Sequence, residues 1–179
     1  MLDFESTALV VVDVQGKLAQ LMANRETLFA NLQRMVRGAQ VLRLPILWVE
    51  QNPNKLGATI PEVASLLPDQ SPIAKMSFSC TGCDDFNRAL KNTGCQQLLV
   101  VGIEAHICVY QTAVGLVEAG YEVEVVTDAV GSRVASNRDV GIKRMESKGV
   151  GLTSTEMALF ELMRTAEHPV FREIQAVVK

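Results

Sequence analysis

Residues 97–108 read Gln-Leu-Leu-Val-Val-Gly-Ile-Glu-Ala-His-Ile-Cys, and this stretch decides the fold class. Its first half, residues 97–102, is apolar after Gln97, which is typical of a strand buried on both faces of a parallel sheet. Residues 105–119 then predict a helix that ends at Gly120, a residue common just past a helix C-terminus. A strand followed by a helix is part of a βαβ unit, and its second strand is expected at residues 121–127.

The same alternation extends in both directions along the chain. Further buried strands are predicted at residues 8–13, 46–49, 71–75 (the weakest candidate) and 150–153. Helices are predicted at residues 17–44, 84–92, from the polar loop 128–136 to residue 148, at 154–163 and from Pro169 onward. The proline-rich residues 53–72 predict an irregular loop with room for one short helix. We therefore expect a three-layer α/β/α, Rossmann-like fold with a doubly wound, mostly parallel six-stranded sheet in the order 3-2-1-4-5-6.

Composition narrows the class of protein. The 179 residues are 48% apolar and 21% charged, as in a globular protein, and we expect residues 1–179 to form a single domain. A net charge of −3 argues against a surface for nucleic acid. No apolar run approaches the ~20 residues of a membrane span. With no basic segment before the first apolar run, the four cysteines are interpreted as reduced thiols in a cytoplasmic protein.

Three residues at strand ends predict a reactive site. Ligands in such sheets bind at the carboxyl ends of the strands, where Asp13, Lys75 and Cys108 all fall. Cys108 lies at the start of a helix, where the helix N-terminus is expected to lower the pKa of a thiol and can hold an oxyanion. Asp13 could accept the thiol proton and Lys75 could stabilise the thiolate. Each residue alone is ordinary, but together they predict a nucleophilic cysteine.

Four neighbouring side chains are candidates for the pocket of a small-molecule substrate: Gln15, Gln51, Phe78 and His106. Two of them also have a plainer interpretation. His106 lies two residues before Cys108 and could cap the helix instead, and Phe78 could belong to the core.

Three segments resemble the isochorismatase-like, or cysteine hydrolase, superfamily. They are ALVVVDVQ at 8–15, AKMSFS at 74–79 and VGIEAHICVYQTA at 101–113. The resemblance implies an Asp-Lys-Cys triad of Asp13, Lys75 and Cys108. It also implies a cis peptide bond at Ile103–Glu104, and an oxyanion hole made by the backbone N–H groups of Glu104 and Cys108. It points to the small isochorismatase-domain group and to a homo-oligomer, a dimer or a tetramer.

Departures from the family patterns narrow the expected chemistry. Nicotinamidases of this family bind a metal through one Asp and two His in the loop after the second strand. This chain has Glu-Gln-Asn-Pro at 50–53 and no histidine before His106, so we expect no metal and no cofactor. True isochorismatases lack the cysteine and hydrolyse a vinyl ether. Cys108 therefore favours a cysteine-dependent hydrolase that cleaves a small amide-like C–N bond through a thioester.

Two alternatives remain at the level of sequence. One is a non-catalytic binding or scaffold protein of the same fold. The other is a redox protein that uses the Cys-x-x-Cys pair Cys80 and Cys83. A complete triad favours the enzyme, because a scaffold has no need of all three residues.

Overall fold

The computed structural model describes residues 1–179 and contains one parallel sheet of six strands. The strands are β1 (Thr7–Val12), β2 (Ile46–Gln51), β3 (Ile73–Lys75), β4 (Gln97–Ile103), β5 (Glu122–Gly131) and β6 (Gly151–Thr153). Their order across the sheet is β3-β2-β1-β4-β5-β6, which confirms the predicted α/β fold and strand order.

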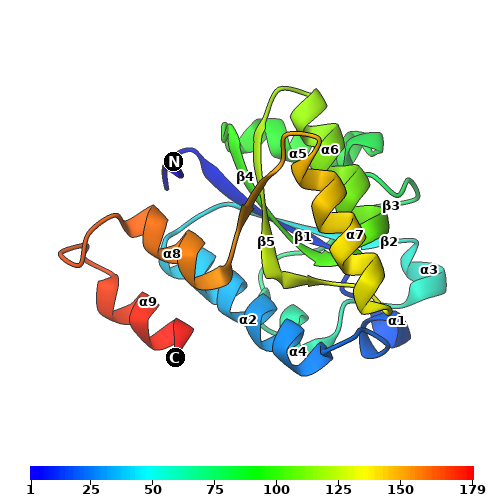
Figure 1. Cartoon of the computed structure of the whole chain (residues 1–179), viewed down its shortest axis with the longest axis horizontal. Coiled ribbons are helices and arrows are strands. Elements are labelled where there is room, and N and C mark those ends of the chain that lie inside the picture. The colour runs from blue at the N-terminus through cyan, green and yellow to red at the C-terminus, as the bar shows by residue number, and fades with distance from the viewer.

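Helices cover both faces of the sheet (Figure 1). One face carries α2 (Arg25–Val41), α4 (Pro61–Ala64), α8 (Thr155–Met163) and α9 (Phe171–Val178). The other carries α5 (Asp84–Thr93), α6 (Tyr110–Glu118) and α7 (Ala135–Glu146). Two short helices, α1 (Gly16–Gln20) and α3 (Pro53–Leu56), follow β1 and β2.

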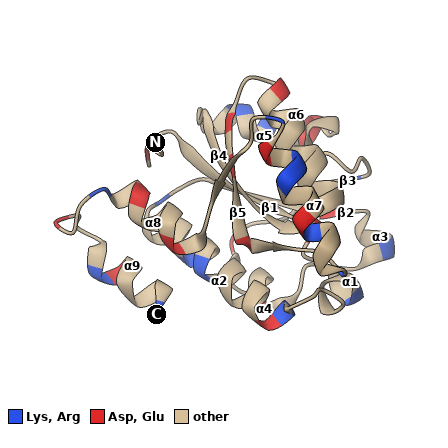
Figure 2. Ribbon diagram, in the orientation of Figure 1, with Lys and Arg blue, Asp and Glu red and all other residues tan.

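The central strands are apolar throughout because both of their faces are buried. In β1, Leu9 and Val11 belong to the core on the α2 side, whereas Val10 and Val12 belong to the core on the α6 side. Successive side chains of a strand point to opposite faces of the sheet, so a strand with helices on both faces needs apolar residues at every position. No helix is long and apolar enough to span a membrane. Figure 2 shows basic and acidic residues interspersed over the outer helices and loops.

The predicted helix at 17–44 is wrong in one respect, because it is divided into α1 and α2. Asn24, directly before α2, has a left-handed backbone with φ of 53°. The chain turns there because the Ala23 N–H donates to the Ser132 carbonyl at 3.0 Å, which ties this segment to the far end of β5. The loop at 53–72 likewise holds two short helices, α3 and α4, in place of one.

The end of β5 also differs from the prediction, which placed a polar loop at 128–136. The β4–β5 register shifts between Val100 and Gly102, so a bulge accommodates the polar residues and the strand then continues. Val130 and Gly131 pair with Gly102 and Ile103. The bulge therefore carries the chain after β5 alongside the end of β4.

Candidate active site

The three predicted site residues follow three different strands. Asp13 comes directly after β1, and Lys75 is the last residue of β3. Cys108 lies in a π-helical turn, η2 (Ala105–Val109), between β4 and α6, where a regular helix start was predicted. The three residues are 1%, 3% and 8% exposed, so the group is buried.

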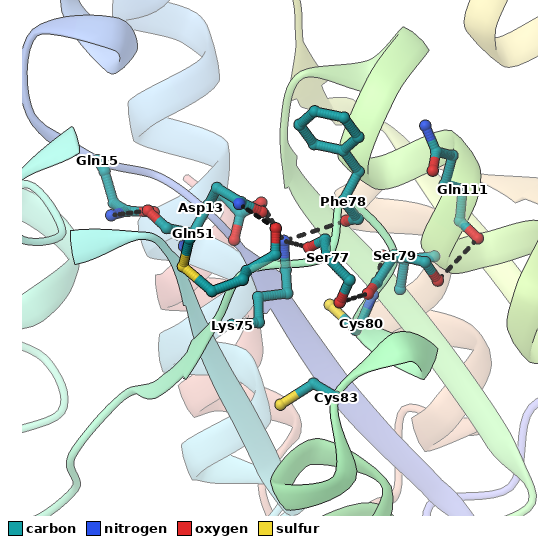
Figure 3. A network of polar contacts seen from close by, with 12 residues as sticks. Asp13, Gln15, Gln51, Lys75, Ser77, Phe78, Ser79, Cys80, Cys83 and Gln111 are labelled. Carbon is teal, nitrogen blue, oxygen red and sulfur yellow. Dashed lines mark hydrogen bonds and ion pairs between the residues drawn. The ribbon is translucent and has the colours of Figure 1, made fainter. Parts of the chain in front are cut away.

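The Lys75 ammonium is held by four oxygen atoms (Figure 3). Nζ lies 2.8 Å from Asp13 Oδ2 and 2.7 Å from Gln51 Oε1. It also lies 3.1 Å from the Ser77 carbonyl oxygen and 3.0 Å from that of Phe78. An ammonium group has three N–H donors, so these acceptors leave none for a ligand. Lys75 is therefore a fixed buried cation beside the Asp13 carboxylate.

Asp13 uses only one of its two carboxylate oxygens. Oδ2 accepts from Lys75, whereas Oδ1 is buried and has no hydrogen-bond partner. Burial raises the pKa of Asp13, against the opposing effect of the Lys75 charge. The Cys108 thiol also opposes this rise in the pKa of Asp13, although the two side chains do not form a hydrogen bond with each other in this structure. Oδ1 is thus an unused acceptor on a carboxylate that interacts with the Cys108 thiol.

The thiol itself does not have the predicted low pKa. Burial raises the pKa of Cys108, the Asp13 carboxylate raises it further, and the Lys75 charge lowers it. The prediction from the helix N-terminus is wrong because α6 begins only at Tyr110 and Cys108 packs in the apolar core. Burial and the Asp13 carboxylate therefore favour the neutral form of the Cys108 thiol.

Glu104 combines a fixed side chain with a free backbone donor. Its peptide bond to Ile103 is cis, and its carbonyl accepts from the N–H groups of Ile107 and Val109 at 3.0 and 3.2 Å. Its own N–H donates to no protein acceptor. Its carboxylate forms an ion pair with Arg133, a residue that the sequence did not indicate as part of the site. No sequence signal could have found Arg133, because only the bulge in β5 brings it to Glu104.

The two glutamines that were predicted to line the pocket, Gln15 and Gln51, form hydrogen bonds within the protein. Gln15 Nε2 donates to the carbonyls of Gln51 and Gly57 at 3.0 and 2.7 Å, and its Oε1 accepts from the Gln51 N–H at 2.7 Å. The Gln51 amide in turn bridges Lys75 and the Met76 carbonyl. Both side chains therefore link β2 to its neighbours, and both amide protons of Gln15 are used within the protein, while contact of either residue with substrate stays a prediction.

The other two pocket candidates lie nearer the surface. The Phe78 side chain is exposed, and its ring points away from the Lys75 ammonium in Figure 3. His106 Nδ1 lies 2.9 Å from Ser132 Oγ, and the ring lines a hollow of about 210 Å³ beside α7. Contact of Phe78 or His106 with substrate stays a prediction.

Five surface hollows of about 210 to 490 Å³ are lined by residues other than Asp13, Lys75 and Cys108. No three His, Cys, Asp or Glu side chains are grouped as metal ligands would be.

Comparisons with known proteins agree with this architecture. The family model described as "Isochorismatase domain" matches residues 7–157. The chain is 34% identical over 178 residues to "Isochorismatase domain-containing protein 2" of Danio rerio, covering 99% of this chain and 89% of that one.

Two solved structures have the same fold over nearly the whole chain. The "MAR1 Ribonuclease from Caenorhabditis elegans" is 35% identical, with a TM-score of 0.92 over 99% of this chain and 91% of that one. The YcaC gene product from Escherichia coli, described as "an octameric hydrolase of unknown specificity", is 26% identical, with a TM-score of 0.88 over 99% and 95%. The chain therefore belongs to the isochorismatase-like hydrolase family.

Proposed function

We propose that this chain is a cysteine-dependent hydrolase that cleaves a small amide-like C–N bond through a thioester on Cys108. One observation carries the proposal. Asp13 has one buried carboxylate oxygen, Oδ1, without a partner, its other oxygen binds Lys75, and its charge acts on the Cys108 thiol. A general base adjacent to a thiol is the arrangement that activates a cysteine nucleophile.

The first half of the reaction forms the thioester. Asp13 Oδ1 accepts the thiol proton while Cys108 Sγ attacks the substrate carbonyl carbon. The backbone N–H groups of Glu104 and Cys108 stabilise the resulting oxyanion. Protonated Asp13 then gives its proton to the leaving amine nitrogen as the C–N bond breaks, and the acyl group remains on sulfur.

The second half releases the acid. Asp13 accepts a proton from a water molecule, which attacks the thioester carbonyl, and the proton returns to sulfur as the C–S bond breaks. Lys75 moves no proton in this scheme, because its donors are all used by protein oxygens. Its charge instead favours the ionised form of Asp13 and of the developing thiolate.

The pKa shifts fit these roles. A carboxylate whose pKa lies above its ordinary value is a stronger base than a surface aspartate. A thiol whose pKa is raised depends on a neighbouring base to take its proton as it attacks. The site is therefore suited to general-base activation of the thiol and not to a preformed thiolate.

A redox role for the Cys-x-x-Cys pair has less support. Cys80 is completely buried, and burial raises its pKa to about 12. Redox cysteines are accessible and have lowered pKa values, so Cys80 is poorly suited to thiol–disulfide exchange.

RNA cleavage, which the name of the C. elegans protein implies for that protein, also has little support in this chain. The net charge of −3 offers no general attraction for a polyanion.

The proposal is tested by measuring ammonia or amine release from a panel of small amides, carbamates and ureides. We expect at least one to be hydrolysed by the wild-type chain, and Cys108→Ala and Cys108→Ser to lower its kcat/KM by about a thousandfold or more. Asp13→Asn is expected to be nearly as damaging. A Cys108→Ala chain that keeps more than ~10% of the activity rules out thiol catalysis. Degradation of an RNA control by wild type, with no amide hydrolysed, contradicts the proposed substrate class.

A further inference from the structure

We infer that Arg133 is a positioning residue for oxyanion stabilisation. Through its ion pair with Glu104 it holds the Glu104 amide N–H toward the carbonyl group that Cys108 attacks. This inference rests on the proposed function, because it assigns a task within the same reaction.

Arg133 holds both carboxylate oxygens of Glu104. Its backbone N–H and its Nε each donate to Glu104 Oε1 at 3.0 Å, and its Nη2 donates to Oε2 at 3.3 Å. The Glu104 side chain is 5% exposed and that of Arg133 is 53% exposed. Two parallel guanidinium bonds and one backbone bond fix the orientation of a carboxylate as well as its charge. Glu104 is therefore anchored from the surface through Arg133.

The anchored residue carries the free donor of the site. Nearly all buried backbone N–H groups in proteins are hydrogen-bonded. Glu104 is buried, yet its N–H donates to no protein atom, while its carbonyl accepts from two amides of the turn that holds Cys108. With the carbonyl and the carboxylate both held, the direction of the N–H is fixed. A preorganised donor of this kind is what stabilisation of an oxyanion requires.

The anchor belongs to a longer connection between two loops. Ile103 pairs with Gly131 at the end of the sheet, and His106 Nδ1 lies 2.9 Å from Ser132 Oγ. Residues 103, 104 and 106 are thus each tied to one of the residues 131–133. The Arg133–Glu104 ion pair is the part of this connection that lies nearest to solvent. It differs from a surface ion pair such as Arg88–Asp85, in which both side chains are exposed, because its carboxylate is buried.

Two reagents separate oxyanion stabilisation from the reactivity of the thiol. Acetylation of Cys108 by p-nitrophenyl acetate passes through an oxyanion, whereas alkylation by iodoacetamide does not. Both rates are measured at Cys108 by peptide mass spectrometry in wild type, Arg133→Gln and Arg133→Lys. Arg88→Gln is the matched control, because it also removes an arginine from a carboxylate pair.

We expect Arg133→Gln to lower the acetylation rate about tenfold or more and to change the alkylation rate less than about twofold, because only one oxyanion donor is misplaced. Arg133→Lys is expected to recover part of the loss, and Arg88→Gln to lose nothing. Glu104→Gln, which keeps the backbone, should reproduce the effect and add little to Arg133→Gln.

Three results overturn the inference in different ways. An equal fall in both rates means that Arg133 supports the fold and not the oxyanion. Unchanged rates in both Arg133→Gln and Glu104→Gln mean that the ion pair has no part in the reaction. A wild-type chain that is alkylated but never acetylated at Cys108 contradicts the proposed function itself, and the inference about Arg133 falls with it.

Discussion

Lys75 has four oxygen acceptors around an ammonium that carries three protons, and this arrangement determines what the residue can do. It cannot donate to a substrate without giving up a protein contact. Its effect on the site is electrostatic, since its charge lowers the pKa of both Asp13 and Cys108. This separates the roles of the three residues into a base, a nucleophile and a fixed cation.

Lys75→Met is expected to raise the pKa of both neighbours. The raised pKa of Asp13 means that the proton-accepting carboxylate form disappears as the pH falls, and it disappears at a higher pH than for an aspartate at 3.8. The acid limb of the pH profile of Cys108 acetylation should therefore lie above that value in wild type and move further up in Lys75→Met. For every tenfold rise in the proton affinity of Asp13, the rate on the acid side falls about tenfold. An acid limb that does not move on loss of Lys75 contradicts this assignment.

Strand ends made the positions of Asp13 and Lys75 predictable, because parallel strands bring their carboxyl ends to one edge of the sheet. The rise in the pKa of Cys108 above its ordinary value could not be predicted in this way. It depends on burial and on a neighbouring carboxylate, which only the folded chain supplies. The same holds for Gln15, whose amide is used entirely by backbone groups that are 36 and 42 residues away.

At the scale of elements, the approach of β4 to β1 depends on Gly102. This glycine has φ of +121°, and a Cβ atom there would lie 2.1 Å from the Val12 carbonyl oxygen. The contact lies where the β4–β5 register shifts and directly before the Ile103–Glu104 bond. Gly102 therefore permits the close packing that leads β4 into the turn with Cys108.

Gly102→Ala is expected to lower the free energy of unfolding by more than ~2 kcal/mol, because left-handed strain and a clash with rigid backbone add together. Gly94→Ala is the matched control. Gly94 also has a positive φ, of +71°, but a Cβ there meets nothing within 4 Å. The control should cost only ~1 kcal/mol, because a residue with a Cβ pays for the left-handed backbone but meets no clash. Urea denaturation measures both, and equal losses would show that backbone strain alone, without the clash, accounts for the effect.

Two of the elements that were predicted incorrectly share a physical cause. The break between α1 and α2 and the extension of β5 both depend on contacts between distant segments, such as the Ala23–Ser132 bond and the pairing of Gly131 with Ile103. Local periodicity carries no information about such contacts. The bulge in β5 matters most, because it places Arg133 at Glu104.

At the scale of the whole molecule, the alternation of apolar runs and amphipathic helices was sufficient to predict the class of fold and the order of the strands. A right-handed crossover between parallel strands leaves few other arrangements. That residues 1–179 form one domain stays a prediction, with α9 packed against the same core as α2.

We expect the chain to be a homo-oligomer in solution. Met76 and Phe78, which follow Lys75 within three residues, expose large apolar side chains. Sedimentation equilibrium at about 10 µM should therefore give a multiple of 19.5 kDa, since symmetric oligomers are common among soluble proteins. A single species of 19.5 kDa at that concentration would contradict the expectation.

The proposed mechanism places the acyl group of the substrate on Cys108. Its most direct test is to mix the wild-type chain with p-nitrophenyl acetate, quench the reaction in acid within seconds and identify the modified peptide by mass spectrometry. We expect one acetyl group on Cys108, removable by hydroxylamine, and none on that peptide in Cys108→Ala. An acetyl group found only on Cys80, Cys83 or Cys95, or on no cysteine, would contradict the claim.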